Sequence, residues 1–427
     1  MRNIIGYLKS NVGALSVAFA LVIPVVVGSA GFAVDLSMAH MVKQRLSHAI
    51  DAAALAAASS AGGGTQSEIG SKVSAFFYKN YPLDKIGATY DLTVTLSGDD
   101  ITVSAKSKYE TSFAKLLGID ELVVSATTTV TREILGLEVG LVLDVTGSMA
   151  TNNNIGALKT AATNFVNTLC RNSACSSLVK IGIVPFATSV NVGPYGLGKN
   201  PNGTTYDTAF VNNPKNLTFN QSQTKQWWGC ILEQSSPNDT KNYGTGWKWN
   251  MYSYSTSNPN NGCNKSYILP LTNVYGTITS KINSLYASGN TLSNLGMVWG
   301  YRLLSPEAPF REGKPWADKT VKKVALLMTD GDNNIGNSYS GYGTWSNLQL
   351  TDHDLDVKLL QTCTNMKNDG ITVYTITFTS GINADTKSYF RNCASSEDKY
   401  YDAPQQADLI DAFEQIAREL SNIHIKS

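Results

Sequence analysis

Charged residues are scarce in this chain of 427 residues: Asp, Glu, Lys and Arg make up 16%, and the formal net charge is +1. A weakly and evenly charged chain offers no electrostatic basis for binding nucleic acid. Histidine is also rare, since the chain has four, and no Cys-x-x-Cys pair is present. The sequence therefore does not predict a zinc site of the His/Cys type. Its length suits two or three domains.

One long uncharged run, Val12–Val34, lies near the N-terminus and is rich in Val, Ala, Leu, Ile and Gly. As a helix it can cross a hydrocarbon core of ~30 Å, with Pro24 as the expected site of a kink. A cleaved signal peptide is the alternative, but the apolar part of such a peptide is usually only about 7–15 residues long. Arg2 and Lys9 favour a cytoplasmic N-terminus, with everything beyond the run outside the cytoplasm.

The six cysteines all lie beyond residue 169, in the part of the chain that this topology exports. An even number of cysteines in an exported chain favours disulfide bonds, and six buried free thiols are the alternative. Sequence proximity predicts the pairs Cys170–Cys175, Cys230–Cys263 and Cys363–Cys393.

The apolar helix is predicted to continue beyond Asp35, where apolar residues recur at steps of three and four and form one stripe. An Ala-rich run follows and ends at Gly62–Gly64. Residues 1–62 are therefore predicted to form a transmembrane and extended helix. The stripe suits packing against other helices or, as the alternative, against the helix's own domain. It consists of Val34, Met38, Met41, Val42, Leu46, Ala49, Ile50 and Ala53.

Residues 63–136 are predicted to form a small α+β module. A helix over 67–81 precedes two segments between residues 90 and 109 that alternate apolar and polar residues around a turn, which indicates a hairpin. A short helix over 111–117 and a β-branched strand over 122–132 complete the module. Its residue pattern is not typical of a catalytic site.

The rest of the chain is organised around Val139–Leu143, a short apolar run typical of a strand buried on both faces. Asp144, Thr146 and Ser148 follow it directly. A strand end followed by a turn can direct this carboxylate and these two hydroxyls at one point. All three are hard oxygen donors, which suit a small hard cation such as Mg²⁺ better than Zn²⁺.

Beyond Ser148, strands and helices alternate regularly, which predicts an α/β fold with a doubly wound sheet over residues 137–423. Helices are expected over 155–169, 272–288, 294–304, 352–368 and 404–423, and strands over 178–186, 321–328, 371–378 and 398–402.

Two more loops of this domain carry oxygen donors. An apolar strand ends in Thr329-Asp330-Gly331, which places a second carboxylate at the same sheet edge as Asp144. Thr291 stands before a predicted helix, so its hydroxyl is free to turn toward that edge. Each residue also has a structural explanation, as a helix cap or a turn residue. Three such loops at strand ends nevertheless favour one metal site, with Asp144, Thr146, Ser148, Thr291 and Asp330 as ligands of Mg²⁺, or of Mn²⁺ or Ca²⁺ instead.

An insertion over about 191–270 separates the first and second of these loops. It is rich in Asn, Gly, Ser, Thr, Tyr and Trp, and Cys230–Cys263 would close it. Aromatic residues among small polar ones are typical of a recognition surface for protein or glycan, and they suit a small core packed by the tryptophans at least as well. The candidate surface residues are Trp227, Trp228, Trp247, Trp249 and Tyr252.

The strand followed by D-x-T-G-S, the later G-x-T, the strand followed by T-D-G, and the closing YYDAPQQADLIDAFEQIAREL resemble a von Willebrand factor A domain. The five ligands named above match its metal-ion-dependent adhesion site. The resemblance implies that the hydroxyls bind the metal directly and that the two acids bind it directly or through water. It also implies that an acidic group of a partner protein completes the coordination. Thr146 stands where serine is commoner in that family, and its hydroxyl can serve equally well.

The whole chain resembles TadG-like proteins of the bacterial Flp/Tad (tight adherence) pilus assembly system. Gly13-Ala14-Leu15 through Pro24 and the run DAAALAAA carry this resemblance at the N-terminus. It implies a minor pilin whose helix packs with other pilus or pseudopilin subunits and with the membrane. The bulk of the chain would then be periplasmic or extracellular on a pilus.

Three functions are consistent with these features. The leading one is a non-enzymatic, envelope-anchored adhesion or assembly protein that binds a partner through its metal. A membrane-tethered scaffold with a purely structural metal is the main alternative. A metal-dependent hydrolase is a third, but no histidine lies near the metal loops in sequence and no nucleophile–base pair is evident, so no catalytic residue is predicted.

Overall fold

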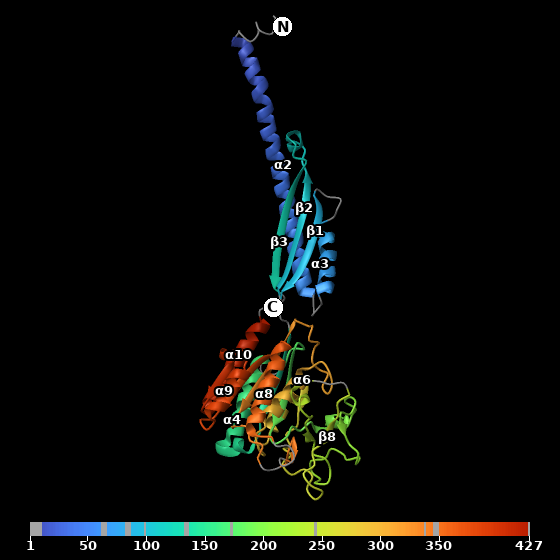
Figure 1. Ribbon diagram of the computed structural model, residues 1–427, viewed down its shortest axis with the longest axis vertical. Helices are drawn as coiled ribbons and strands as arrows, with labels where there is room; N and C mark the ends of the chain where they lie inside the picture. Colours follow the sequence, from blue (N-terminus) through green and yellow to red (C-terminus); the bar gives the residue numbers. More distant parts are fainter. Residues whose placement is uncertain are drawn as a thin grey trace. The chain divides into compact units, whose positions relative to one another are not determined.

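The computed structural model describes residues 11–60, 66–81, 87–97, 100–131, 136–170, 174–242, 246–336, 339–344 and 350–425 (Figure 1). The chain divides into two compact units, residues 1–133 and 134–427. The long N-terminal helix and the small module, predicted as separate regions, thus lie in the same unit. Arg2, Lys9 and the expected helix end at Gly62–Gly64 lie outside the described residues.

The first unit is built on α2 (Asn11–Ser60), a helix of 50 residues that contains Pro24. Among the described residues, one stretch is long and apolar enough to span a membrane, the 43 residues Ser16–Ala58 of this helix. Apolar side chains from Val17 to Val34 are mostly exposed, as is Met41 of the stripe, whereas the stripe is buried at Val42 and from Leu46 onward. This later part of the stripe packs on the helix's own module, which was the alternative to packing on other helices.

The module that covers α2 is a helix and a three-stranded antiparallel sheet in the order β1-β2-β3. Its buried side chains come from one face of β2 and one face of α3, because the residues of β2 alternate between buried and exposed along the strand. The hairpin, short helix and β-branched strand that the sequence predicts are all present. The elements are α3 (Gln66–Asn80), β1 (Ala88–Ser97), β2 (Asp100–Glu110), η1 (Ala114–Leu117) and β3 (Glu121–Thr131).

The second unit contains a six-stranded sheet in the order β14-β13-β10-β4-β5-β9, parallel except for the edge strand β9. The central strand β4 is buried along its whole length, as its apolar run predicts. This confirms the predicted doubly wound α/β architecture. The strands are β4 (Gly136–Asp144), β5 (Val179–Phe186), β9 (Leu269–Thr272), β10 (Val321–Thr329), β13 (Thr372–Phe378) and β14 (Tyr400–Ala403).

Helices cover both faces of this sheet. Alternate residues of β4 pack with α4, α5 and α10 on one face, and Val142 packs with α6, α8 and α9 on the other. The predicted helix over 272–288 is wrong at its start, because residues up to Thr272 pair with β5 as an edge strand. The helices are α4 (Asn154–Leu169), α5 (Tyr275–Asn283), α6 (Ser293–Leu304), α8 (Asp352–Asn368), α9 (Ala384–Cys393) and α10 (Gln406–Ile425), with single turns at η2 (Gly147–Asn153), η3 (Gly193–Leu197), η4 (Asn238–Thr240) and η5 (Glu397–Lys399).

Helix α6 approaches the sheet closely because two glycines face it. A β-carbon on Gly296 would lie 2.4 Å from the Phe186 side chain, and one on Gly300 would lie 2.5 Å from Val142. Larger residues at either position would push the helix outward, since real β-carbons do not approach other atoms this closely. The chain just before α6 is thereby held at the carboxyl edge of β4 and β5.

The aromatic residues of the insertion form a core in place of a surface at three of the five predicted positions. Trp227, Trp249 and Tyr252 are each 2% exposed, so the surface prediction is wrong for them. The Trp249 ring lies 5.1 Å from the ring of Trp299 on α6, which joins the insertion to the main core. Trp228 and Trp247 are half-buried, and their role in recognition stays a prediction. The short strands of the insertion are β6 (Val211–Asn212), β7 (Ile231–Leu232) and β8 (Trp249–Met251), and a separate pair farther along the chain is β11 (Tyr339–Ser340) and β12 (Gly343–Thr344).

Three disulfides link the second unit, and they are the three pairs expected from sequence proximity. Cys170–Cys175 closes the end of α4, Cys230–Cys263 closes the insertion, and Cys363–Cys393 joins α8 to α9. None of the six cysteines is free. The insertion is therefore held covalently as well as by its aromatic core.

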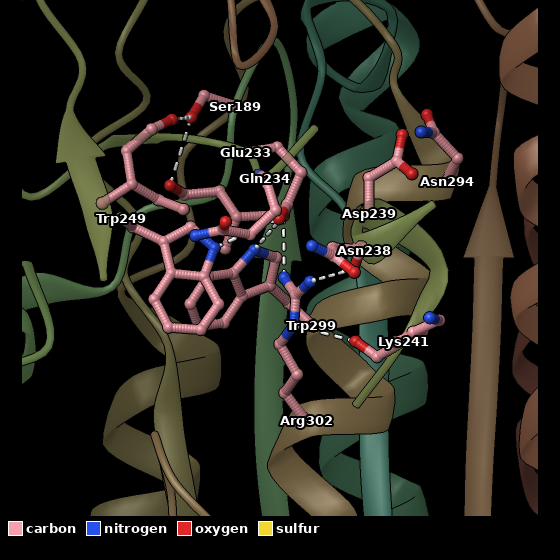
Figure 2. Close-up of polar contacts among 12 residues, drawn as sticks. Ser189, Glu233, Gln234, Asn238, Asp239, Lys241, Trp249, Asn294, Trp299 and Arg302 are labelled. Carbon is pink, nitrogen blue, oxygen red and sulfur yellow. Dashed lines mark hydrogen bonds and ion pairs between the residues drawn. The ribbon is translucent and has the colours of Figure 1, made fainter. Parts of the chain in front are cut away.

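A buried ion pair also fixes the insertion to α6 (Figure 2). The Glu233 carboxylate accepts hydrogen bonds from Arg302 Nη1 at 2.8 Å and from the indole N–H groups of Trp249 and Trp299 at 3.1 and 2.9 Å. Arg302 donates further to the carbonyls of Asn238 and Lys241. The two charged side chains are 1% exposed or less, so their partners replace the water that both have lost.

We expect Glu233→Gln to lower the free energy of unfolding by about 3–5 kcal/mol, because it leaves the Arg302 charge buried without its counter-ion. The matched control is Asp207→Asn, which breaks the exposed pair between Arg311 and Asp207 and should cost ~1 kcal/mol or less. Denaturant titration of the full chain measures both. Equal losses in the two variants would contradict a structural role for the buried pair.

A second buried cation, Lys281 on α5, has no carboxylate partner among the described residues. Its Nζ lies 3.0 Å from the centroid of the Tyr267 ring, and the side chain is 8% exposed. Burial lowers the pKa of this amine from its ordinary value of 10.5 to about 7, because the charged form loses its hydration.

The folded protein therefore releases the Lys281 proton near pH 7, while the unfolded chain keeps it up to about pH 10.5. Because the unfolded state binds more protons between these values, stability should rise with pH there, by up to about 1.4 kcal/mol per pH unit. Lys281→Met should lack this rise. Denaturant titrations of both proteins across the interval test it, and parallel pH profiles would refute it.

Candidate metal centre

The first metal-loop residue, Asp144, ends β4 and is fully buried. Its Oδ1 accepts the backbone N–H of Thr146 at 2.8 Å, and its Oδ2 accepts the Thr329 hydroxyl at 2.7 Å. Thr329 is the last residue of β10, which runs parallel to β4. Met328 of β10 pairs in register with Leu143 of β4. The two strands thus bring their last residues to one point, as the carboxyl ends of parallel strands do.

A chain of hydroxyls connects this first loop to the carboxylate that follows β10. The Ser148 hydroxyl donates to Asp330 Oδ1 at 2.5 Å, and the hydroxyl oxygens of Ser148 and Thr146 lie 2.8 Å apart. Thr146 and Asp330 are buried, whereas Ser148 is exposed. The cluster therefore opens to solvent on the side of Ser148.

Backbone hydrogen bonds join the second loop, residues 289–291, to the first loop after β4 and to the third loop after β10. The N–H of Gly147 donates to the carbonyl of Gly289, and the N–H of Asn334 donates to the carbonyl of Thr291, both at 2.8 Å. A β-carbon on Gly331 would lie 3.5 Å from Thr291 Oγ1 and 3.8 Å from Ser148 Oγ. The hydroxyls of Thr291 and Ser148 thus face the same glycine, and the structure brings all five predicted ligands to one edge of the sheet.

Two residues that support the cluster were not predicted as part of it. The Thr329 hydroxyl orients Asp144, and the threonine of the T-D-G motif was a visible signal for it. Asn264 of the insertion is 2% exposed and donates from Nδ2 to the carbonyls of Val145, Tyr286 and Ser288 at 2.8–3.1 Å. It ties the first loop to the second, and no local sequence pattern distinguishes it from the other asparagines of the insertion.

Burial and mutual repulsion both act on the two carboxylates. Burial, and after it the nearby charge of Asp330, raises the pKa of Asp144 to about 7. Burial likewise raises the pKa of Asp330, against the opposing effect of the Ser148 hydrogen bond. A cation between the two carboxylates would relieve this repulsion.

The donor set fits a hard divalent cation. It consists of two carboxylates and three hydroxyls, all oxygen, which is the ligand type that Mg²⁺ prefers. In the part of the chain that the structure describes, no group of three or more His, Cys, Asp or Glu side chains gathers to hold an ion. A cation here would therefore depend on Thr146, Ser148 and Thr291 as much as on the two acids.

One family model and several solved structures resemble this chain. Residues 13–60 match the model described as "Putative Flp pilus-assembly TadE/G-like", which confirms the resemblance of the N-terminal segment. No curated protein matches the chain.

The solved structures are similar at low identity. The vWF domain of the type V pili tip protein Mfa5 from Porphyromonas gingivalis has 13% identity and a TM-score of 0.40, over 69% of this chain and 97% of that one. The pilus adhesin SpaC from Lactobacillus rhamnosus GG has 13% identity and a TM-score of 0.39, over 79% of this chain. Proximal thread matrix protein 1 from the mussel byssus has 16% identity and a TM-score of 0.35, over 68% of this chain. A structure of that byssus protein has a zinc-occupied MIDAS motif.

This chain spans 34% of the length of SpaC and 47% of that of the byssus protein. Residues 13–60 thus resemble the TadE/G-like Flp pilus-assembly family, and the second unit has the doubly wound α/β architecture that its resemblance to a von Willebrand factor A domain predicts.

Proposed function

We propose that this protein is an envelope-anchored, pilus-associated adhesion or assembly protein that binds an acidic partner group through a divalent cation. The observation that carries the proposal is the gathering of five oxygen-bearing side chains from three loops at one sheet edge. The TadE/G-like segment supports the envelope and pilus setting. No catalytic residue is part of the proposal.

Each residue of the centre has a distinct task in this proposal. Asp144, Asp330, Thr146, Ser148 and Thr291 would hold Mg²⁺, and the bound ion would supply a Lewis-acidic position for a carboxylate of the partner. Thr329 fixes one oxygen of Asp144, which orients the other toward the loop. Ser148 stands at the exposed side, so a partner group would approach next to it.

Three neutral hydroxyls are important for this chemistry because they leave much of the cation's charge uncompensated. An added acidic group then gains more electrostatic stabilisation than it would beside a cation already neutralised by four or five carboxylates. This is why we favour partner binding over the alternative, a scaffold in which the cation only stabilises the fold.

We place the membrane at the exposed apolar part of α2, from Val17 to Val34, and the second unit outside the cytoplasm. The same exposed helix face is the part available to other pilus or pseudopilin subunits, since the later part packs on the module. The three disulfides agree with an oxidising compartment.

We expect Asp144→Ala to abolish Mg²⁺ binding to the full chain in detergent, and Ser148→Ala to weaken it by about tenfold or more, since each removes an oxygen ligand. Asp398→Ala and Ser222→Ala are the matched controls, because both residues are exposed and Asp398 precedes β14, at the sheet edge opposite the three loops. Isothermal titration with MgCl₂ measures the affinity. Unchanged binding in Asp144→Ala would refute the proposed centre.

Partner binding and a structural metal predict different outcomes in cells. We expect the protein to leave with sheared pili, and the amount in the sheared fraction to fall in Ser148→Ala while its thermal unfolding temperature stays near that of the wild type. The scaffold alternative predicts a lower unfolding temperature with unchanged fractionation. Cell fractionation and thermal unfolding of the purified variant distinguish the two.

A further inference from the structure

The connection between β2 and β3 carries apolar side chains that stay exposed among the described residues of the first unit. This connection, residues 111–120, is called the η1 tip here, after the short helix it contains. Leu116 is 84% exposed and Leu117 66%, and Phe113 and Ile119 are 41% and 38% exposed. Such a group of exposed apolar side chains marks a contact surface more often than isolated ones do.

The η1 tip is fixed against α2 by a buried carboxylate. Asp35 of α2 accepts hydrogen bonds from the backbone N–H groups of Ser112, Phe113 and Ala114 at 2.9, 2.8 and 2.6 Å. The side chain of Asp35 is fully buried, so these bonds replace its hydration. The tip is therefore held in one position beside this part of the helix (Figure 1).

Gly31 of α2 also contacts the η1 tip, close to Asp35 along the helix. A β-carbon on Gly31 would lie 2.6 Å from the Phe113 side chain, so the tip lies directly against the helix there. Residues 31–35 and the η1 tip therefore occupy the same height along the helix axis, with Leu116 and Leu117 facing outward.

That height coincides with the end of the uncharged part of the helix. Val12–Val34 contains no charged residue, and as a helix it is about 35 Å long, enough for a hydrocarbon core of ~30 Å. Asp35 is the first charged residue after it, and it faces the η1 tip in place of solvent. The exposed apolar surface of the helix is thus continuous with that of the tip.

We propose that the η1 tip inserts into the membrane surface beside α2, with Leu116 and Leu117 in contact with lipid. The proposal rests on the proposed membrane anchoring of α2. Lys115 is exposed between these apolar residues and can extend its ammonium group to the lipid headgroups. A second contact with the bilayer would restrain the tilt of the module relative to the membrane, which a single helix does not do.

Site-directed spin labels on single introduced cysteines test this proposal. All six native cysteines are in disulfides, so a label reacts only with the introduced thiol. Leu116→Cys reports on the η1 tip, and Val22→Cys reports on the proposed span. Leu55→Cys is the matched control, because Leu55 of α2 is 59% exposed and lies farther along the helix than the η1 tip. The full chain is reconstituted in phosphatidylcholine–phosphatidylglycerol bilayers, and relaxation by oxygen is compared with relaxation by a water-soluble nickel chelate.

We expect oxygen to relax the labels at Val22 and Leu116 more strongly than nickel, and nickel to dominate at Leu55. Nickel dominance at Leu116 with Val22 in lipid would overturn the tip proposal and leave the anchor intact. Nickel dominance at Val22 would overturn the anchor and the tip proposal together. Shielding of Leu116 from both reagents would also overturn it, because another protein chain would then cover the tip.

Discussion

The second unit depends on placing two carboxylates at the buried ends of neighbouring parallel strands. Asp144 is the last residue of β4, and Asp330 directly follows β10. Their like charges raise the free energy of the ionised pair in a site with little water. Hydrogen bonds from Thr146, Ser148 and Thr329 offset part of this energy. The proposed cation would relieve the remaining repulsion between the two carboxylates.

The insertion supports the metal loops as well as adding surface. Glu233 binds it to Arg302 of α6, the helix that begins just after Thr291. Asn264 connects it to the carbonyls of the first and second loops. Because both contacts are buried, they hold the insertion firmly against the three loops.

The first unit uses one helix for two different environments. From Leu46 onward the stripe of α2 is buried by β2 and α3, and before Val34 the apolar side chains are exposed. Asp35 marks the change, since it is the first charged residue after the uncharged run and binds the η1 tip. A continuous helix suits both the exposed and the buried part, because it satisfies its own backbone hydrogen bonds in either surrounding.

The sequence by itself determined the parallel strands of the main sheet, the oxygen donors at their ends and the disulfide pairs. Buried parallel strands read as continuous apolar runs, and their carboxyl ends meet at one edge, so the positions of Asp144 and Asp330 follow from local patterns. The long apolar helix and the hairpin of the first unit were predictable for the same reason, since periodicity is a local property.

Only the tertiary structure decided which faces are covered. Aromatic enrichment in the insertion left a surface and a core open, because the same side chains suit both, and the structure buries Trp227 and Trp249. The edge strand before α5, the support by Asn264 and the attachment of the η1 tip to Asp35 also depend on partners far away in the chain. Burial is set by those distant partners, and a local sequence pattern does not contain them.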